Sequence, residues 1–371
     1  MINKNKSIVI TGGHVTPALA VIEVLAHKIP EVSIVCIGRA HAFEGIHSPT
    51  NEKRLMEEKS VRFVPIEAGR VRRFFGISNL IALVKIPIGF IQAFFYLLFH
   101  KPSVILSFGG YVAVPIAVAG KLLGIPLVTH EQTASPGSGN VFLGKIADKV
   151  CVSFVDTEKF FPAGKAIMTG LPLRSSIRTI SETRSVPVPE GLPILYITGG
   201  STGAQSLNEL IFPLISKLTE TFAVVHQTGI VSLKKAEELR LSLPEHRRER
   251  YVLNDFFDEQ DVSYFLYHAR LIIGRAGANS TAEFLRTGAP TILVPLPWSG
   301  QKEQEHNAEI ARGIGPVTVV HQKSATPESL MAHINGRLSK NDRKIGEQKI
   351  FFSPPDAAEN VVDVLRPFIR R

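Results

Sequence analysis

Two glycine pairs could handle a phosphorylated ligand, and the first is Gly12-Gly13, which lies between Thr11 and His14. Because glycines have no side chain, backbone amides there can approach a ligand closely, and the helix expected to follow favours negative charge at its start. A neutral imidazole at His14 could accept the proton of an attacking hydroxyl. The structural alternative is that His14 only caps the turn through a hydrogen bond.

The second pair, Gly199-Gly200, repeats this arrangement in the second half of the chain and is followed by Ser201. Glycines and hydroxyls at a helix start suit a diphosphate, whose negative charge grows as it leaves. The alternative is an ordinary turn between a strand and a helix.

Two further segments could bind a nucleotide or a sugar. Ser280 and Glu283 have the spacing of a capping box, but Glu283 could instead accept two hydrogen bonds from a ribose diol. Gln304 and Asn307 carry amides that could pair with sugar hydroxyls, or that could simply form a polar helix face.

The run His130–Thr133 ends an apolar strand, where ligands bind in parallel sheets. Glu131 could alternatively brace the next turn by accepting backbone amides. The chain has no Asp-x-Asp triplet, Walker loop or zinc-ligand spacing. We therefore expect no metal and no other cofactor, and we expect backbone amides and helix dipoles to stabilise the phosphate charge.

Short apolar runs alternate with helical stretches, which predicts parallel sheets covered on both faces. The strands expected in the first half are Ser7–Ile10, Val32–Ile37, Val61–Pro65, Val104–Phe108, Leu127–His130 and Val150–Ser153. The pattern restarts after a polar, proline-rich segment, Ser181–Pro193, which we interpret as a linker. The fold class expected is α/β, with two doubly wound Rossmann-like domains at 1–175 and 190–352 facing across a cleft. A last helix at 356–371 should pack back on the first domain.

Length, charge and cysteine content limit the classes of function that this protein can have. The length of 371 residues suits two domains, and 42 Lys+Arg against 33 Asp+Glu give a net charge of +9. Since no basic motif with interleaved aromatic residues is present, we expect no nucleic-acid partner. Cys36 and Cys151 lie in apolar runs and should be buried thiols in a reducing compartment. The first residues lack the apolar stretch of a signal peptide.

The apolar segment Leu80–Phe99 stands apart from the rest. Lys85, Pro87 and Gln92 near its middle count against a membrane-spanning helix, although the length allows one. An aromatic, apolar segment with a basic border fits the interface of an anionic membrane surface, and an ordinary buried helix is the other alternative. The basic border consists of Arg70, Arg72, Arg73 and Lys101.

Ten motifs in order along nearly the whole chain resemble the MurG family, the UDP-N-acetylglucosamine:muramyl-pentapeptide N-acetylglucosaminyltransferases. They are TGGHVTPALAV, SFGGYVAVP, GIPLVTHEQTASPGSGN, GLPLR, ITGGSTGAQSLN, HQTG, DFFDEQD, RAGANSTAEF, GAPTILVP and QEHNA. The resemblance implies a GT-B fold and an inverting, metal-independent transfer of N-acetylglucosamine from UDP-N-acetylglucosamine. The acceptor implied is the C4 hydroxyl of a muramyl-pentapeptide polyprenyl diphosphate, a lipid-linked intermediate of peptidoglycan synthesis. A peripheral enzyme on the cytoplasmic face of the plasma membrane is implied as well.

The resemblance also assigns roles to residues. It makes His14 the catalytic base, gives acceptor binding to the first domain and gives nucleotide binding to the second. The donor-binding positions that it implies are Thr11, Gly12, Gly13, Thr133, Arg174, Ser201, Phe257, Ala278, Asn279, Ser280, Thr281, Ala282, Glu283, Gln304 and Asn307. Two departures are notable, because Val9 and Ile10 replace two glycines of the family's first loop and Thr133 replaces an asparagine.

Three other functions remain open from the sequence. A related glycosyltransferase could act on diacylglycerol or another lipid. A UDP-N-acetylglucosamine 2-epimerase shares the two-domain architecture, but its acid–base carboxylates have no clear counterpart here. A sugar-nucleotide-binding membrane subunit without turnover is the non-enzymatic alternative.

Overall fold

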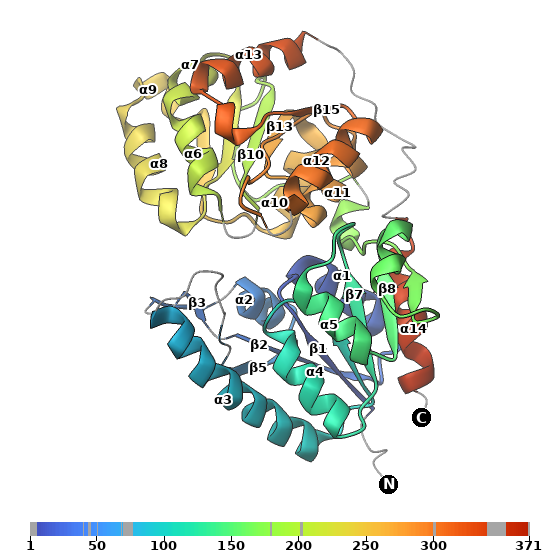
Figure 1. Ribbon diagram of the computed structural model, residues 1–371. Helices are drawn as coiled ribbons and strands as arrows, with labels where there is room; N and C mark the ends of the chain where they lie inside the picture. The colour runs from blue at the N-terminus through green and yellow to red at the C-terminus, as the bar shows by residue number, and fades with distance from the viewer. Residues whose placement is uncertain are drawn as a thin grey trace. The chain divides into compact units, whose positions relative to one another are not determined.

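The computed structural model describes residues 6–39, 41–43, 46–49, 51–67, 69, 77–178, 180–200, 203–299, 302–339 and 354–369. The chain forms two compact units. The first comprises Met1–Arg174 together with Phe351–Arg371, and the second comprises Ser175–Ile350 (Figure 1).

The first unit is built on a parallel sheet of seven strands in the order β5-β2-β1-β6-β7-β8-β9. Its strands are β1 (Ser7–Thr11), β2 (Ser33–Arg39), β5 (Arg62–Ile66), β6 (Val104–Ser107), β7 (Leu127–Glu131), β8 (Lys149–Val152) and β9 (Ala166–Met168). Its helices are α1 (Val15–Lys28), α2 (Asn51–Glu58), α3 (Ile77–His100), α4 (Ala113–Leu122), α5 (Ser138–Ile146) and α14 (Ala357–Ile369). The six predicted strands nearly coincide with β1, β2, β5, β6, β7 and β8. Neither β9 nor the hairpin of β3 (His41–Phe43) and β4 (Ile46–Pro49) was predicted.

The second unit has a parallel sheet of six strands in the order β12-β11-β10-β13-β14-β15. Its strands are β10 (Ile194–Thr198), β11 (Ala223–Gln227), β12 (Tyr251–Asn254), β13 (Ala269–Gly274), β14 (Thr291–Leu293) and β15 (Val317–Val319). Its helices are α6 (Gln205–Ile211), α7 (Ile215–Thr221), α8 (Ile230–Ser242), α9 (Glu245–Arg248), α10 (Glu259–His268), α11 (Ala278–Thr287), α12 (Glu303–Ile314) and α13 (Pro327–Leu338). Two doubly wound α/β units are therefore present, as the sequence predicted.

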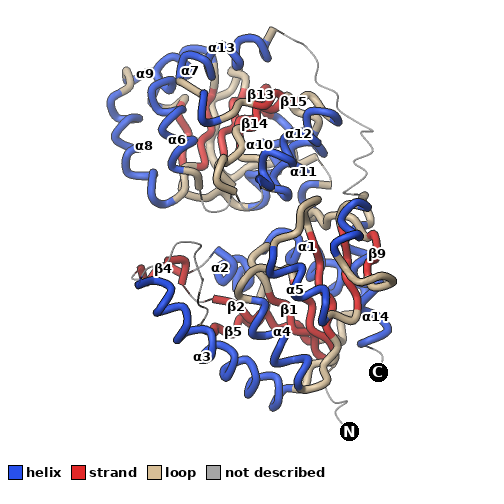
Figure 2. The backbone as a smooth tube through the Cα atoms, viewed as in Figure 1, coloured by secondary structure: helices blue, strands red, loops and turns tan. Residues whose placement is uncertain are grey.

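The central strands of both sheets are buried along their whole length. Every residue of β6, β7, β10 and β11 is buried, because helices cover both faces of each sheet (Figure 2). This double cover explains why these strands are continuous apolar runs rather than alternating patterns. Cys36 and Cys151 are buried free thiols, which confirms the prediction that they are buried.

The strand order reverses at one point in each sheet. In the first unit this point lies between β1 and β6, with Thr11 beside Ser107. In the second unit it lies between β10 and β13, with Thr198 beside Gly274. Loops leave in opposite directions at such a point, and the crevice outside the carboxyl ends of the strands is where open α/β sheets bind ligands.

The last helix, α14, packs on the first unit. Lys28 of α1 forms an ion pair with Glu359, and the Asn360 amide donates to the Thr169 carbonyl at 3.3 Å. Gly170 has a φ of +85°, and a β-carbon there would lie only 2.3 Å from Cδ of Pro354. Only a glycine at position 170 therefore lets the backbone approach Pro354 this closely.

The segment Ser181–Pro193, predicted as a linker, is attached to α10 of the second unit. The Asp261 carboxylate accepts hydrogen bonds from the backbone N–H and the hydroxyl of Ser185, both at 2.7 Å. The Arg184 guanidinium stacks on the Tyr264 ring at 4.8 Å and donates to its hydroxyl. The polar residues that suggested a linker thus have partners on a helix.

Helix α3 contains the apolar segment Leu80–Phe99 and presents two different faces. Ala93 and Leu97 are completely buried and belong to the core of the first unit. The opposite stripe is exposed, with accessible fractions of 52% for Ile91, 52% for Phe95 and 77% for Phe99. The ordinary buried helix considered above therefore describes only one face of α3.

Within the described part of the chain, no helix combines the length and apolar character needed to cross a membrane. Lys85, in the middle of the segment, is paired with Glu67 at 3.3 Å. Of the predicted basic border, Arg70, Arg72 and Arg73 lie outside the described residues.

Candidate functional site

The loops that end β1 and β6 pack backbone against backbone. Gly12 has a φ of +133°, and a β-carbon on it would lie 2.8 Å from the carbonyl carbon of Phe108. The Gly13 N–H donates to the Gly109 carbonyl at 3.1 Å. Only glycine allows this approach, so the predicted first glycine loop lies at the reversal point of the first sheet.

His14 lies at the N-cap of α1 and makes no side-chain capping hydrogen bond within the described structure, so the capping alternative is wrong. Burial of its ring lowers the pKa of His14 from its ordinary value. Burial also lowers the pKa of the neighbouring His130 to about 4, and the charge of His14 adds to that effect. Both imidazoles are therefore neutral near pH 7, the state that a general base requires. The buried Thr11 hydroxyl has no hydrogen-bond partner among the described residues.

The turn after β7 is held by the buried carboxylate of Glu131. Its Oε1 accepts the Thr133 N–H at 2.9 Å and lies 2.8 Å from the Thr133 hydroxyl, while Oε2 accepts the Asn140 amide at 2.7 Å. The bracing role considered for Glu131 is thus confirmed. Thr133 is buried and its hydroxyl is engaged inside the turn, and Arg174 is buried at the end of the first unit.

The second glycine loop lies at the reversal point of the second sheet. The Gly200 N–H donates to the Thr198 hydroxyl at 3.1 Å, and the Gly203 N–H donates to the Gly200 carbonyl at 3.2 Å. A β-carbon on Gly203 would lie 2.7 Å from Cα of Gly229, so this loop presses against the turn after β11. Ser201, predicted to bind the diphosphate, lies outside the described residues.

Helix α11 carries most of the predicted donor residues. It begins at Ala278, with Gly277 as N-cap and no side-chain capping bond among the described residues, so Ser280 and Glu283 lie inside the helix. The capping-box alternative is therefore wrong. Glu283 is only 6% exposed, and Ala282 is completely buried. Within the described structure, two buried oxygens of this first turn have no hydrogen-bond partner, Oδ1 of Asn279 and Oγ1 of Thr281.

Gln304 and Asn307 lie three residues apart on α12 and brace two loops. The Gln304 Oε1 accepts the Leu296 N–H at 3.0 Å. The Asn307 amide donates to the Ala276 carbonyl at 3.0 Å and is buried. One side-chain atom of each residue is thus used to hold loops at the end of β13 and β14.

Gln227, at the end of β11, was not predicted as a site residue. Its Nε2 donates to the Gly200 carbonyl at 3.0 Å, and its Oε1 accepts the Phe257 N–H at 3.2 Å. A single buried amide therefore ties the glycine loop to the segment that holds Phe257, the predicted nucleotide-binding aromatic residue. The sequence signal for Gln227 was its position at the carboxyl end of a buried strand.

Arg275, directly after β13, is a second residue that sequence reasoning missed. Its guanidinium donates to the Ser206 hydroxyl at 2.7 Å and to the Val294 carbonyl at 2.8 Å. Burial lowers the pKa of Arg275 to about 10, so the side chain remains charged at neutral pH. The sequence contained a signal for this role, because Arg275 is a cationic residue directly after an apolar strand and is the first residue of the motif RAGANS.

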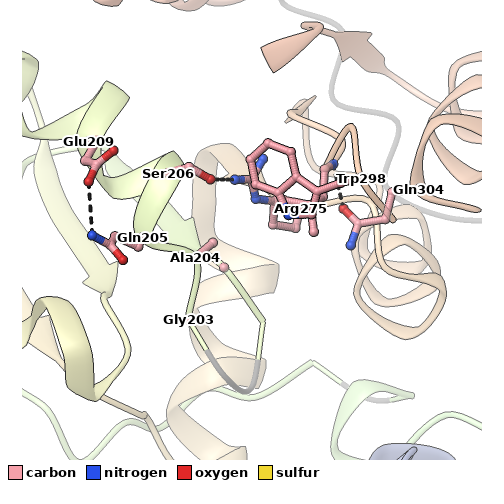
Figure 3. Close-up of a pocket in the computed structure, with 10 residues that line it drawn as sticks. Gly203, Ala204, Gln205, Ser206, Glu209, Arg275, Trp298 and Gln304 are labelled. Atoms are coloured by element: carbon pink, nitrogen blue, oxygen red, sulfur yellow. Dashed lines mark hydrogen bonds between the residues drawn. The ribbon is translucent and has the colours of Figure 1, made fainter. Parts of the chain in front are cut away.

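Arg275 also lines a pocket of about 480 Å³ in the second unit. Glycines 199 and 203 and the start of α6 form one side, and Leu296, Trp298 and Gln304 form another. Figure 3 shows Trp298 and Gln304 grouped around Arg275, with Gln205 and Glu209 farther along α6. Among the described residues, no group of His, Cys, Asp or Glu could hold a metal ion.

Two family descriptions match the chain in succession. Residues 9–152 match the N-terminal domain of glycosyltransferase family 28, and residues 194–361 match its C-terminal domain. A protein from Treponema denticola is 35% identical over 329 residues, which cover 86% of this chain and 83% of that protein. It is named UDP-N-acetylglucosamine–N-acetylmuramyl-(pentapeptide) pyrophosphoryl-undecaprenol N-acetylglucosamine transferase. The chain belongs to the MurG family of glycosyltransferases.

Solved structures agree with this assignment. MurG of Acinetobacter baumannii is 28% identical and has a TM-score of 0.66, over 98% of this chain and 99% of that one. The MurG-type GT-B fold predicted from the sequence is therefore confirmed. A UDP-GlcNAc 2-epimerase from Neisseria meningitidis, bound to UDP-GlcNAc, has a TM-score of 0.65 over 97% of this chain and 99% of that one. At 12% identity this likeness shows the fold alone.

The bridging role of Gln227 gives a prediction for Gln227→Glu. An ionised carboxyl cannot donate to the Gly200 carbonyl, so at pH 8 the variant should bind UDP more weakly by about 1–3 kcal/mol. Burial raises the pKa of a carboxyl, and the protonated form can donate again. The affinity should therefore recover toward the wild-type value as the pH falls to about 5.5.

Calorimetric titration of both proteins at each pH measures this. Gln260→Glu, the same chemical change at an exposed position of α10, is the control and should follow the wild type. A loss of affinity that is the same at every pH, or no loss, would contradict the bridging role.

Proposed function

We propose that this protein transfers N-acetylglucosamine from UDP-N-acetylglucosamine to the C4 hydroxyl of a muramyl-pentapeptide polyprenyl diphosphate. The second unit binds the nucleotide sugar and the first unit binds the lipid-linked acceptor. The enzyme works as a peripheral protein on the cytoplasmic face of the plasma membrane, in peptidoglycan synthesis.

The position of the glycine loops carries this proposal. Both loops lie at the reversal points of their sheets. Thr11 Oγ1, next to the first loop, and Asn279 Oδ1 and Thr281 Oγ1, in the first turn of α11, are buried without a partner in the described structure. Buried polar groups normally have partners, and a ligand with hydroxyl and phosphate groups would supply them. The name of the Treponema denticola relative contains the same substrates.

In the proposed reaction the residues have the following roles. The C4 oxygen of the acceptor attacks the anomeric carbon of the donor from the side opposite the diphosphate, which inverts that carbon. The new C–O bond forms as the bond to the β-phosphate oxygen breaks, and UDP leaves with the bonding electrons. His14 accepts the hydroxyl proton, while backbone amides of the second glycine loop and the start of α11 stabilise the charge on UDP.

This proposal predicts UDP release that depends on a lipid-linked muramyl acceptor. His14→Ala should lower turnover by roughly 10²–10⁴, the usual contribution of a positioned base, with little change in donor affinity. His27→Ala, at the exposed far end of the same helix, is the matched control and should keep wild-type turnover.

The lowered pKa of His14 sets the pH profile. The rate requires the neutral imidazole, so it should fall only as the pH drops below the ordinary histidine value of about 6.5. UDP release without the muramyl acceptor, or with diacylglycerol instead, would contradict the acceptor assignment. Wild-type turnover of His14→Ala at saturating substrates would remove His14 from the mechanism.

The exposed stripe of α3 supports the membrane part of the proposal. Ile88, Ile91, Phe95 and Phe99 recur every three or four residues, which places them on one side of the helix. An apolar, aromatic stripe of this kind can rest in the interface of a bilayer while the opposite face stays in the core.

A triple variant should be released from anionic vesicles if Ile91, Phe95 and Phe99 are all replaced by Ser. Each replaced residue loses up to about 1.5–3 kcal/mol of free energy from apolar burial in the membrane. The three changes together should therefore weaken vesicle binding at least tenfold. Turnover of a short water-soluble acceptor should survive, and Leu241→Ser, at an exposed position of α8, should bind vesicles normally. A folded wild type that stays in the supernatant with vesicles at low salt would contradict the interfacial role.

A further inference from the structure

Trp298 is the only tryptophan of the chain, and its side chain is 68% exposed. A large apolar ring on the surface of a folded protein loses the free energy that burial would give. This ring is not isolated, however, because it lines the pocket that Arg275 and Gln304 also line (Figure 3). A ligand in this pocket would therefore contact the ring.

The turn that carries Trp298 is fixed on both sides. The Ser299 N–H donates to the Leu296 carbonyl at 3.2 Å, and the Lys302 N–H donates to the Ser299 carbonyl at 3.1 Å. The Gln304 side chain accepts the Leu296 N–H, and its backbone N–H donates to the Ser299 hydroxyl at 3.2 Å. A ring on such a preorganised turn loses little conformational freedom when a ligand binds.

The remaining lining of the pocket is polar. Gln304 has an amide nitrogen in addition to the oxygen used by Leu296, and Gln205 and Glu209 offer further donors and acceptors along α6. A ligand that matches this pocket needs an apolar face for the indole and several hydroxyl or amide groups at its edge. A pyranose ring with an N-acetyl group has this combination, since its C–H bonds form a face and its hydroxyls lie around the rim.

We infer that Trp298 is a stacking platform for the sugar ring of the donor, and that it contributes to binding the sugar rather than the nucleotide. The inference rests on the proposed function and deepens it. Phe257, a predicted donor-binding residue, and Glu283, predicted to hold the ribose, do not line this pocket. Because Gly199 and Gly203 of the loop assigned to the diphosphate form one side of the pocket, the pocket is assigned to the diphosphate and to the sugar beyond it, which lies beside Trp298.

Because the protein has one tryptophan, its fluorescence reports this position directly. Titration with UDP-N-acetylglucosamine should change the intensity and shift the emission to shorter wavelength, as the indole becomes covered. UDP alone should leave the spectrum nearly unchanged. An equal response to both ligands would assign Trp298 to the nucleotide and overturn the inference.

Variants test the contribution to affinity. Trp298→Ala should weaken binding of UDP-N-acetylglucosamine roughly tenfold and leave UDP binding unchanged, and Trp298→Phe should keep most of the affinity. Leu241→Ala, at an exposed apolar position outside the pocket, is the control for folding and should bind both ligands normally. Melting temperatures of all variants verify that they are folded.

The outcomes separate the two proposals. If the wild type binds UDP-N-acetylglucosamine and Trp298→Ala binds it equally well, the platform is overturned while the proposed function stands. If Trp298→Ala loses affinity for UDP to the same extent, the sugar assignment is overturned. If the folded wild type binds neither ligand, the proposed function fails, and the inference fails with it.

Discussion

Close backbone contacts that only glycine permits, at the carboxyl ends of the central strands of the two sheets, are the constraint on which the candidate site depends. Gly12 lies against Phe108, and Gly203 lies against Gly229, at distances that a β-carbon on either glycine would violate. Each contact brings the ends of neighbouring parallel strands together and leaves amides and helix starts directed to the carboxyl edge. The polar residues predicted to bind substrate lie mainly along these two edges, because that is where the strands end.

Buried polar side chains hold these edges in place. Glu131, Gln227 and Arg275 each connect two segments of the chain, and each makes at least two hydrogen bonds. Removing one partner would leave a buried polar group unsatisfied, which costs more than the bond itself contributes. The loops are therefore fixed before any substrate arrives, and a preorganised site loses less free energy on binding.

The amino-acid sequence allowed the fold and the two loops to be predicted because both follow from local patterns. Apolar runs marked buried strands, and glycine pairs marked the ends of β1 and β10. The capping box of Ser280 and Glu283 was a misleading local pattern, since the helix begins at Ala278. Gln227 and Arg275 were missed because their roles come from partners far away in the sequence, such as Gly200 and Ser206. The polar composition of Ser181–Pro193 likewise did not predict that this segment forms hydrogen bonds with Asp261.

The central claim is that the carboxyl edge of the second sheet binds a uridine nucleotide through Glu283. Calorimetric titration of wild type and Glu283→Gln with UDP, beside a melting curve of each protein, tests it most directly. The account predicts an affinity lower by about 1–3 kcal/mol in the variant, because bonds to a charged acceptor have that strength, with a nearly unchanged melting temperature. Unchanged affinity for UDP in a variant that melts at a lower temperature would contradict it and leave Glu283 a structural residue.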